Sequence, residues 1–231
     1  MENIIQIRGV TKKYRNKKAL DNLSLDIKKG GVIGILGPNG SGKTTLIKIL
    51  TGLLRSSSGE VLIDGQTPGP YTKSIVSYLP DRNFLYDWMT VDEAIRFYKD
   101  FYEDFDREKA INLIEFMDLK LDMRIKELSK GMHEKLNLSL VLARRAKVYI
   151  IDEPIAGVDP VARDQILDAI VKNYDEESTM IITTHLVRDM ESLFDDVAFL
   201  RDGTIDLIGN AESLREERGM QIDDLYKEIF G

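Results

Sequence analysis

The sequence of 231 residues contains no cysteine and only two histidines. A disulfide framework and a thiolate metal site are therefore excluded, and a reducing compartment is compatible with the chain. No apolar run approaches the roughly 18 residues that a membrane-spanning helix requires, and residues 1–4 show no signal-peptide pattern. We expect a chain that is soluble by itself, so that any role at a membrane depends on a partner.

Basic residues are also too few for a typical nucleic-acid-binding protein. The 32 lysines and arginines are outnumbered by 39 aspartates and glutamates, which gives a formal net charge of −7. Proteins that neutralise nucleic-acid phosphates carry a basic excess or a clustered basic face. The densest basic run, residues 12–18, is more simply explained as a solvated surface hairpin. We therefore expect no nucleic-acid partner.

The chain does contain a glycine-rich segment between two apolar runs. Residues 37–45 contain the pattern G-x-x-x-x-G-K-[ST], follow the apolar residues 32–36 and precede the helix-like residues 46–50. A strand, a glycine-rich loop and a helix in this order are typical of a phosphate-binding loop, whereas an ordinary glycine-rich turn is the alternative. The predicted nucleotide-binding residues are Gly37, Pro38, Asn39, Gly40, Ser41, Gly42, Lys43, Thr44 and Thr45.

Each residue type in this loop has a chemical task. Glycines let successive backbone N–H groups converge on phosphate oxygens, and the following helix adds the positive end of its dipole. Lys43 is expected to reach the β- and γ-phosphates, and the Thr44 hydroxyl to ligate Mg²⁺. The sequence therefore predicts a site for a nucleotide and a magnesium ion.

Two adjacent carboxylates form a second candidate motif. Asp152 and Glu153 follow the four apolar residues 148–151, which are predicted to form a buried strand. P-loop proteins place the acid that holds Mg²⁺ at such a strand end. Because adjacent residues point in different directions, Asp152 is expected to face the metal and Glu153 an attacking water, as general base. A solvated acidic turn is the alternative.

The order of predicted elements indicates an α/β fold. Helices are expected over residues 43–51, after the N-cap residue Asp159, and at the C-terminus around Leu225. An Asp202-Gly203 pair predicts a hairpin near the end of the chain. Strands are expected at residues 4–10, 23–27, 32–36, 60–63, 75–79, 148–151, 180–184, 197–200 and 204–208.

A helical segment of about fifty residues is expected to begin near Arg82. Residues 90–93 form a capping box before apolar residues at helical spacing, and a second helix is predicted over residues 107–117. A third, longer helix follows residues 128–132. The aromatic residues of this segment, including the only tryptophan, Trp88, are expected to form a small core of their own, with a partner-binding surface as the alternative.

Together these motifs resemble the nucleotide-binding subunits of ABC transporters over essentially the whole chain. The resemblance implies an α/β fold: a P-loop NTPase core with a mixed, mainly parallel sheet, an N-terminal antiparallel β subdomain and an inserted α-helical subdomain. Within one ATPase domain, 1–231, it assigns residues 1–81 and 146–231 to the core and β subdomain, and 82–145 to the helical subdomain. It is carried by residues 37–44, 78–81, 128–132, 150–154, 156–160 and 183–185.

The resemblance also implies roles that no single motif explains. Tyr14 would stack on adenine, and His185 would bond the γ-phosphate and orient the attacking water. Ser129 and Gly131, in the signature Leu-Ser-Lys-Gly-Met, would face the γ-phosphate of ATP held by a second subunit. Each site would therefore be shared by two chains, in a homodimer or a heterodimer.

Hydrolysis of ATP would then need no covalent intermediate. The resemblance implies that Glu153 polarises water while Lys43, His185 and Mg²⁺ stabilise charge on the transferred phosphoryl group. Thr44, Asp152 and Asp81 are the candidate metal ligands.

Two departures from the family pattern matter. Lys130 and Met132 stand where the family commonly has glycine and glutamine, and we expect Lys130 to add a cation near the partner's phosphate. Asp81 stands where the family has a glutamine that contacts Mg²⁺ and water. As a hard oxygen donor Asp81 is expected either to ligate Mg²⁺ or to leave a water in its place.

The expected function is an ATPase that couples hydrolysis to transport and docks on separate integral membrane permease subunits. Such a chain would lie in the cytoplasm, at the inner face of the cell membrane. The short cassette and its two variant motifs favour a bacterial exporter-type protein of the ABC-2 group. The alternatives are a soluble regulatory ATPase of the same family without a transport role, and one that acts on ribosomes or DNA.

Overall fold

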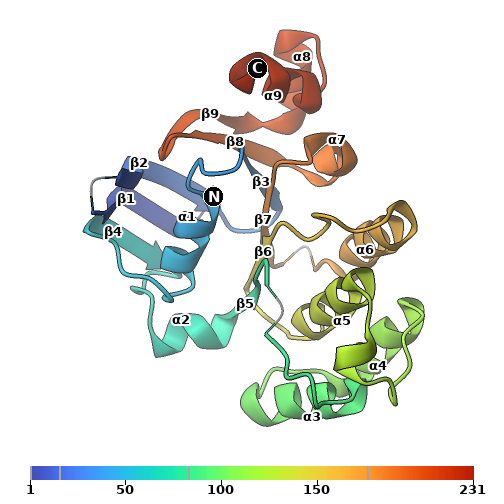
Figure 1. Cartoon of the computed structure of the whole chain (residues 1–231). Coiled ribbons are helices and arrows are strands. Elements are labelled where there is room, and N and C mark those ends of the chain that lie inside the picture. Colours follow the sequence, from blue (N-terminus) through green and yellow to red (C-terminus); the bar gives the residue numbers. More distant parts are fainter. Residues whose placement is uncertain (1, 16, 83, 176) are drawn as a thin grey trace.

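The computed structural model describes residues 2–15, 17–82, 84–175 and 177–231. Met1, and Asn16 in the predicted basic hairpin, lie outside the described residues. Two β-sheets and the helices packed on them make up the fold (Figure 1). The smaller sheet is antiparallel, with strand order β2-β1-β4, and confirms the expected N-terminal β subdomain. Its strands are β1 (Asn3–Tyr14), β2 (Lys17–Lys28) and β4 (Ser58–Ile63).

The larger sheet contains six described strands in the order β5-β6-β7-β3-β8-β9. Of these strands only β9 runs antiparallel to its neighbour, so the predicted mixed, mainly parallel sheet is confirmed. β3 pairs with β7 and β8 and is buried along its whole length, which explains its continuously apolar sequence. The strands are β3 (Val32–Leu36), β5 (Val76–Leu79), β6 (Val148–Asp152), β7 (Thr179–Thr184), β8 (Asp196–Arg201) and β9 (Thr204–Asn210).

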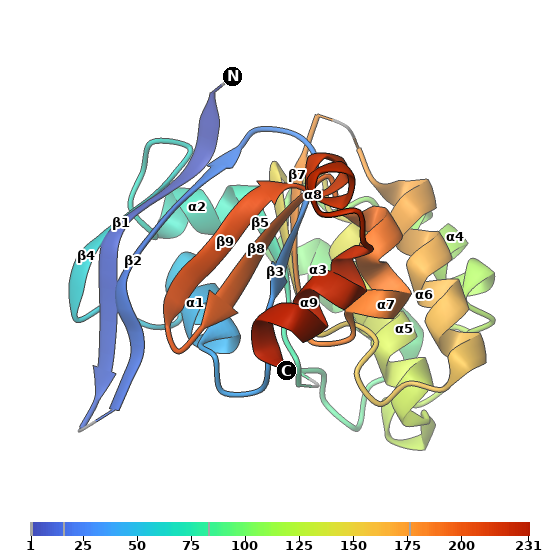
Figure 2. The same cartoon turned by 90° about the horizontal axis from the view of Figure 1, so that it is seen from above.

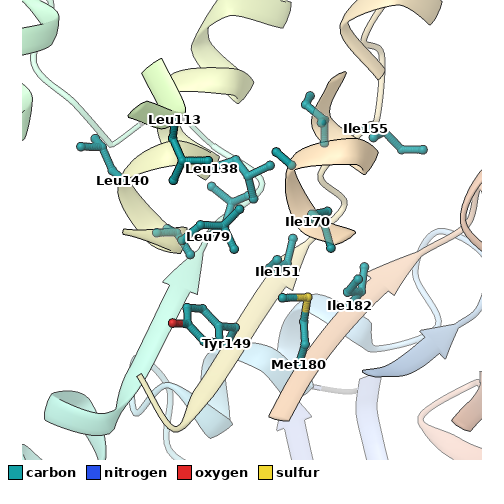
Figure 3. Close-up of a cluster of buried hydrophobic side chains, with 14 of the residues drawn as sticks. Leu79, Leu113, Leu138, Leu140, Tyr149, Ile151, Ile155, Ile170, Met180 and Ile182 are labelled. Atoms are coloured by element: carbon teal, nitrogen blue, oxygen red, sulfur yellow. The ribbon is translucent and has the colours of Figure 1, made fainter. Parts of the chain in front are cut away.

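Two hydrophobic cores lie on opposite faces of the larger sheet, because neighbouring strand residues point to opposite sides. Ile33 and Ile35 of β3 belong to the core that the smaller sheet and the first helix complete. Leu79, Ile151 and Ile182, from β5, β6 and β7, belong to the core beneath the other helices, as Figure 3 shows. The strands therefore connect the two sides of the molecule.

Residues 91–142 form the expected helical insert. The capping box is confirmed, since Thr90 Oγ1 accepts from the Glu93 N–H (3.2 Å) and Glu93 Oε2 accepts from the Thr90 N–H (2.7 Å). The last helix of the insert is buried on nearly every side from Lys135 onward, which anchors the insert to the sheet. The helices are α3 (Val91–Phe101), α4 (Arg107–Phe116), the 3₁₀ turn η1 (Ile125–Glu127) and α5 (Lys130–Leu142).

The aromatic residues of the insert separate into two groups. Tyr98 and Phe105 are 6% and 3% exposed and belong to the core. Trp88 is 65% exposed, so the expectation that it lies in the core is wrong. It precedes α3 in a turn and stacks on Tyr86, with ring centroids 5.9 Å apart, rather than packing beneath a helix. The exposed rings favour the alternative of a partner-binding surface.

Three helices that the sequence patterns did not predict are α2 (Pro70–Ile75), α7 (Val187–Met190) and α8 (Ala211–Arg218). All three are too short for hydrophobic periodicity to stand out. In the described part of the chain, no helix combines the length and the apolar character needed to cross a bilayer. The remaining helices are α1 (Lys43–Leu50), α6 (Pro160–Asn173), the 3₁₀ turn η2 (Glu191–Leu193) and α9 (Ile222–Phe230).

Candidate nucleotide-binding site

The glycine-rich loop joins the carboxyl end of β3 to the N-terminus of α1. Gly40 and Gly42 have φ angles of +84° and +117°, which side chains larger than hydrogen adopt only with strain. At Gly37 a Cβ atom would collide with the carbonyl oxygen of Leu200. The loop conformation therefore depends on glycine at these positions, as the motif predicted.

Lys43, the first residue of α1, is buried beneath the loop that precedes it. Its ammonium donates to the carbonyl oxygens of Gly37 (2.6 Å) and Pro38 (3.2 Å), and the side chain is 6% exposed. The same nitrogen lies 3.3 Å from Oε1 of Glu153. Lys43 of the glycine-rich motif and Glu153 of the paired-carboxylate motif thus form an ion pair.

Glu153 lies between Lys43 and His185. Its Oε2 atom is 2.8 Å from His185 Nδ1 and also accepts from the His185 backbone N–H (3.3 Å). Its backbone has φ +53°, an uncommon value for a residue with a side chain. The N–H of Glu153 donates to the carbonyl of Thr183 (3.0 Å), which holds this strained residue in place. Strain of this kind concentrates at functional sites.

Asp152 ends β6 and is 1% exposed. The Thr183 hydroxyl donates to its Oδ1 atom (2.5 Å), a contact that the sequence motifs did not reveal. Burial raises the pKa of Asp152, and the charges of Asp81 and Glu153 add to this effect, while hydrogen bonds from Thr183 and Thr44 oppose it. Thr44 and Asp152 are therefore neighbours, as the predicted metal site requires.

The residues around Asp152 fit a hard cation. Its Oδ2 atom is buried and has no hydrogen-bond partner among the described residues. A buried carboxylate oxygen without a partner is costly, and Mg²⁺ binds through such oxygens. No group of three or more described His, Cys, Asp or Glu residues could hold a metal. Mg²⁺ here would depend on one or two protein oxygens together with phosphate and water, which is its usual mode of binding.

The signature residues lie at the start of α5, apart from the glycine-rich loop. Ser129 is exposed, and its hydroxyl caps α5 by accepting from the Met132 N–H (3.3 Å). Gly131 packs against Ala162 and Asp159 at the start of α6. Among the described contacts, neither Ser129 nor Gly131 touches the loop of its own chain. The structure thus brings Lys43, Glu153 and His185 together but leaves Ser129 facing outward.

Two further residues have surroundings that the sequence could not reveal. The ammonium of Lys130 lies over Gly157 of its own chain, where φ is +68° and a Cβ atom would displace the lysine side chain. Tyr14, at the end of β1, is 47% exposed, and Lys12 Nζ lies 5.4 Å from the centre of its ring. An exposed ring is free to stack on a base, and the adenine contact stays a prediction.

Comparison with known proteins decides the family. The sequence profile described as ABC transporter matches residues 20–156, more than half of the chain. The chain belongs to the ABC transporter family. It is 32% identical over 217 residues to the ABC transporter ATP-binding protein YtrB of Bacillus subtilis (strain 168), across 93% of this chain and 74% of that protein.

Solved structures support the fold of this ATP-binding subunit. A structure described as the ATP binding subunit of an ABC transporter superposes with a TM-score of 0.87 at 24% identity, covering 97% of this chain and 98% of that one. The dimeric post-hydrolysis structure of the cassette MJ0796, bound to ADP and Pi, superposes with a TM-score of 0.78 at 22% identity, covering 89% and 98%. The likeness to the exporter-type ABC-2 group stays a prediction.

Two residues at which this ABC subunit departs from the family pattern, Asp81 and Lys130, both act on Glu134. Asp81 is exposed just after β5, and its charge raises the pKa of both Asp152 and Glu134. Glu134 lies one turn into α5, half-buried. Burial raises the pKa of Glu134 to about 7, Lys130 opposes the increase, and Asp81 adds to it. The signature helix therefore carries an acid that titrates near neutral pH.

Replacing Glu134 by glutamine is expected to flatten the pH dependence of stability. Between pH 4.5 and 7 the Glu134 carboxyl binds its proton more firmly in the folded chain than in the unfolded chain. The free energy of unfolding therefore falls as pH rises through that window. Above pH 7 Glu134→Gln should be more stable than the wild type by about 1 kcal/mol or more, after allowance for partial exposure. Urea unfolding at pH 5 and pH 8 measures this, and parallel pH profiles would contradict it.

Proposed function

We propose that this ABC subunit hydrolyses ATP and transmits the energy to a transporter. The observation that carries the proposal is the arrangement of Lys43, Glu153 and His185, in which one carboxylate contacts both an ammonium and an imidazole. An ammonium at this loop stabilises negative charge on phosphate, and a largely buried carboxylate beside it accepts a proton from water. These two tasks are the chemical requirements of phosphoryl transfer to water.

In the proposed mechanism the glycine-rich loop holds the phosphates of ATP through its backbone N–H groups and Lys43. Mg²⁺, when bound at Thr44 and Asp152, would neutralise charge on the phosphate oxygens. Glu153 takes the proton of the attacking water, and its two oxygens are kept in position by Lys43 and His185. His185 is then placed to bond the γ-phosphate, as the family resemblance implies.

Two subunits would complete each site. Ser129 is exposed at the N-terminus of a 13-residue helix, where backbone N–H groups and the helix dipole favour an anion. Because it faces away from the loop of its own chain, the phosphate it meets would be held by a second chain. The dimeric MJ0796 cassette bound to ADP and Pi supports this arrangement. Homodimers and heterodimers both satisfy it.

The proposed docking surface for membrane subunits is an apolar groove lined by residues of α1, α2, β5 and α3 and of the loops beside them. The groove has a volume of about 560 Å³ and is lined by exposed apolar side chains, such as Leu53 and Phe101. Its charged lining residues are the cations Lys48, Lys73 and Arg82 and one carboxylate, Asp81. A helix with one apolar face and acidic residues beside it would match both properties. We therefore expect the occupant to be a cytoplasmic helix of an integral membrane permease, which holds this chain at the inner face of the membrane.

Replacing Phe101 by aspartate is expected to abolish recovery of the membrane subunit with a tagged chain while ATP binding is retained. Phe101 is 69% exposed in the groove and lies outside the nucleotide site. Phe116→Asp is the matched control, because Phe116 is 39% exposed on α4 and does not line the groove. Recovery of the membrane subunit by Phe101→Asp would contradict the docking surface. A wild-type chain that turns over ATP but recovers no membrane subunit would favour the regulatory ATPase instead.

Exchanging Asp81 for glutamine or alanine tests its place in the metal site. If Asp81 ligates Mg²⁺ or a water on it, Asp81→Ala should raise the Mg²⁺ concentration for half-maximal ATP turnover several-fold, with Asp81→Gln closer to the wild type. A magnesium titration of all three proteins, at saturating nucleotide, measures this effect. Equal magnesium dependence in the three would remove Asp81 from the site.

A further inference from the structure

The turn between β8 and β9 contacts the glycine-rich loop directly. Figure 2 shows the tip of this hairpin beside α1. The N–H of Gly203, in the turn, donates to the carbonyl oxygen of Ser41 (2.8 Å), and its own carbonyl accepts from the N–H of Asp21 on β2 (3.0 Å). The turn therefore links the loop to the smaller sheet through the backbone alone.

The bond to Ser41 fixes the orientation of one peptide unit. The carbonyl of Ser41 and the N–H of Gly42 belong to the same planar, trans peptide and point in opposite directions. When Gly203 holds the carbonyl outward, the N–H of Gly42 is directed to the other side of the loop. Phosphate-binding loops require their N–H groups on that side. Gly203 thus determines where a phosphate-binding donor points.

Space at the turn admits only glycine. Gly203 has φ +84°, and a Cβ atom there would lie 2.8 Å from the Ala19 carbonyl oxygen and 2.8 Å from Leu20 Cα. Both contacts are with backbone atoms, which cannot move aside as a flexible side chain would. A side chain at this position would push the turn away from β2 and from the loop.

We propose that Gly203 is a positioning residue for nucleotide binding, which holds the Ser41–Gly42 peptide in its phosphate-binding orientation. The inference rests on the proposed function of the loop, because it assigns Gly203 an effect on bound phosphate. Gly203 itself touches no substrate. Replacing Gly203 should therefore weaken nucleotide binding more than it slows ATP hydrolysis once the nucleotide is bound.

The chain offers a matched control in its other Asp-Gly turn. Asp64 and Gly65 have φ values of +49° and +72°, close to the +47° and +84° of Asp202 and Gly203. A Cβ atom at Gly65 would meet no atom within 4 Å. Gly65→Ala therefore carries the backbone strain of the substitution without the collision.

The experiment compares Gly203→Ala with Gly65→Ala in the full chain. Binding of a fluorescent ATP analogue with Mg²⁺ and the midpoint of thermal unfolding are measured for both. We expect both variants to lose thermal stability, but only Gly203→Ala to raise the dissociation constant, by about tenfold or more. Equal dissociation constants in two folded variants would overturn the inference. A wild-type chain that binds no analogue would overturn the proposed function instead.

Amide hydrogen exchange of the wild type keeps the inference testable if Gly203→Ala does not fold. NMR should show the Gly203 N–H exchanging at least about tenfold more slowly than the Gly65 N–H without nucleotide, and more slowly still once MgADP is bound. Equal exchange of the two amides in the nucleotide-free chain would overturn the inference, whatever the nucleotide does.

Discussion

Replacing Glu153 by glutamine should slow ATP hydrolysis by about a hundredfold or more while ATP still binds. An amide of the same shape fills the same space but cannot take a proton from water. Removing the negative charge also releases Lys43, whose ammonium lies 3.3 Å from Glu153, to interact with phosphate. We therefore expect the variant to bind ATP at least as tightly as the wild type and to accumulate as an ATP-bound dimer.

Single-turnover hydrolysis and size-exclusion chromatography with MgATP measure the two effects of Glu153→Gln. Glu177→Gln is a suitable control, because that carboxylate is 89% exposed and its nearest cation is 3.8 Å away. The control should hydrolyse ATP as the wild type does. Normal turnover by Glu153→Gln would contradict its assignment as general base and would leave the proposed mechanism without a proton acceptor.

The sequence could indicate which side chains lie close together in the candidate site because its motifs are local. Lys43 follows its glycines directly, and Asp152 and Glu153 end an apolar strand, so each motif carries its own structural context. Their meeting follows from a parallel sheet, in which the carboxyl ends of β3, β6 and β7 share one edge. Elements that depend on distant partners were not predictable. The bond from Thr183 to Asp152 and the contact of Gly203 with Ser41 join residues with no pattern between them.

The sequence also could not predict which aromatic side chains of the helical insert are exposed. Tyr98 and Trp88 both stand in an apolar, aromatic-rich segment, yet one is 6% and the other 65% exposed. Tyr98 occupies the inward face of α3, whereas Trp88 lies in the turn before it. Periodicity distinguishes the faces of a helix but not of a turn, so the core expected from composition contains only some of these rings.

Arg144 holds parts of the fold together, although no sequence motif predicts this role. It is 3% exposed, just after α5, and its guanidinium bonds Asp104, between α3 and α4, through contacts of 3.0–3.2 Å. It also donates to the carbonyls of Val76 (2.7 Å) and Ser74 (2.8 Å) and stacks over Tyr102 at 4.0 Å. One side chain thus joins the helical insert to the edge strand of the larger sheet.

Replacing Arg144 by methionine is therefore expected to destabilise the chain by about 3 kcal/mol, because the partly buried Asp104 and two carbonyls lose their donor. Methionine keeps much of the apolar volume, so the loss reflects charge and hydrogen bonding more than a cavity. Urea unfolding monitored by circular dichroism measures the free energy. The neighbouring Arg145 provides the control, since it is 76% exposed and pairs with Asp106 at the surface.

Arg145→Met should change the free energy of unfolding by less than about 1 kcal/mol, because exposed ion pairs contribute little. Equal stability of the two variants would mean that the Arg144 contacts do not hold the insert on the sheet. The substitution also bears on the proposed shared nucleotide site, because α5 begins after its N-cap Ser129 and leads into Arg144 at its other end. A loosened insert would present the signature residue in a variable position, so ATP-driven dimerisation of Arg144→Met should weaken even at temperatures where the chain stays folded.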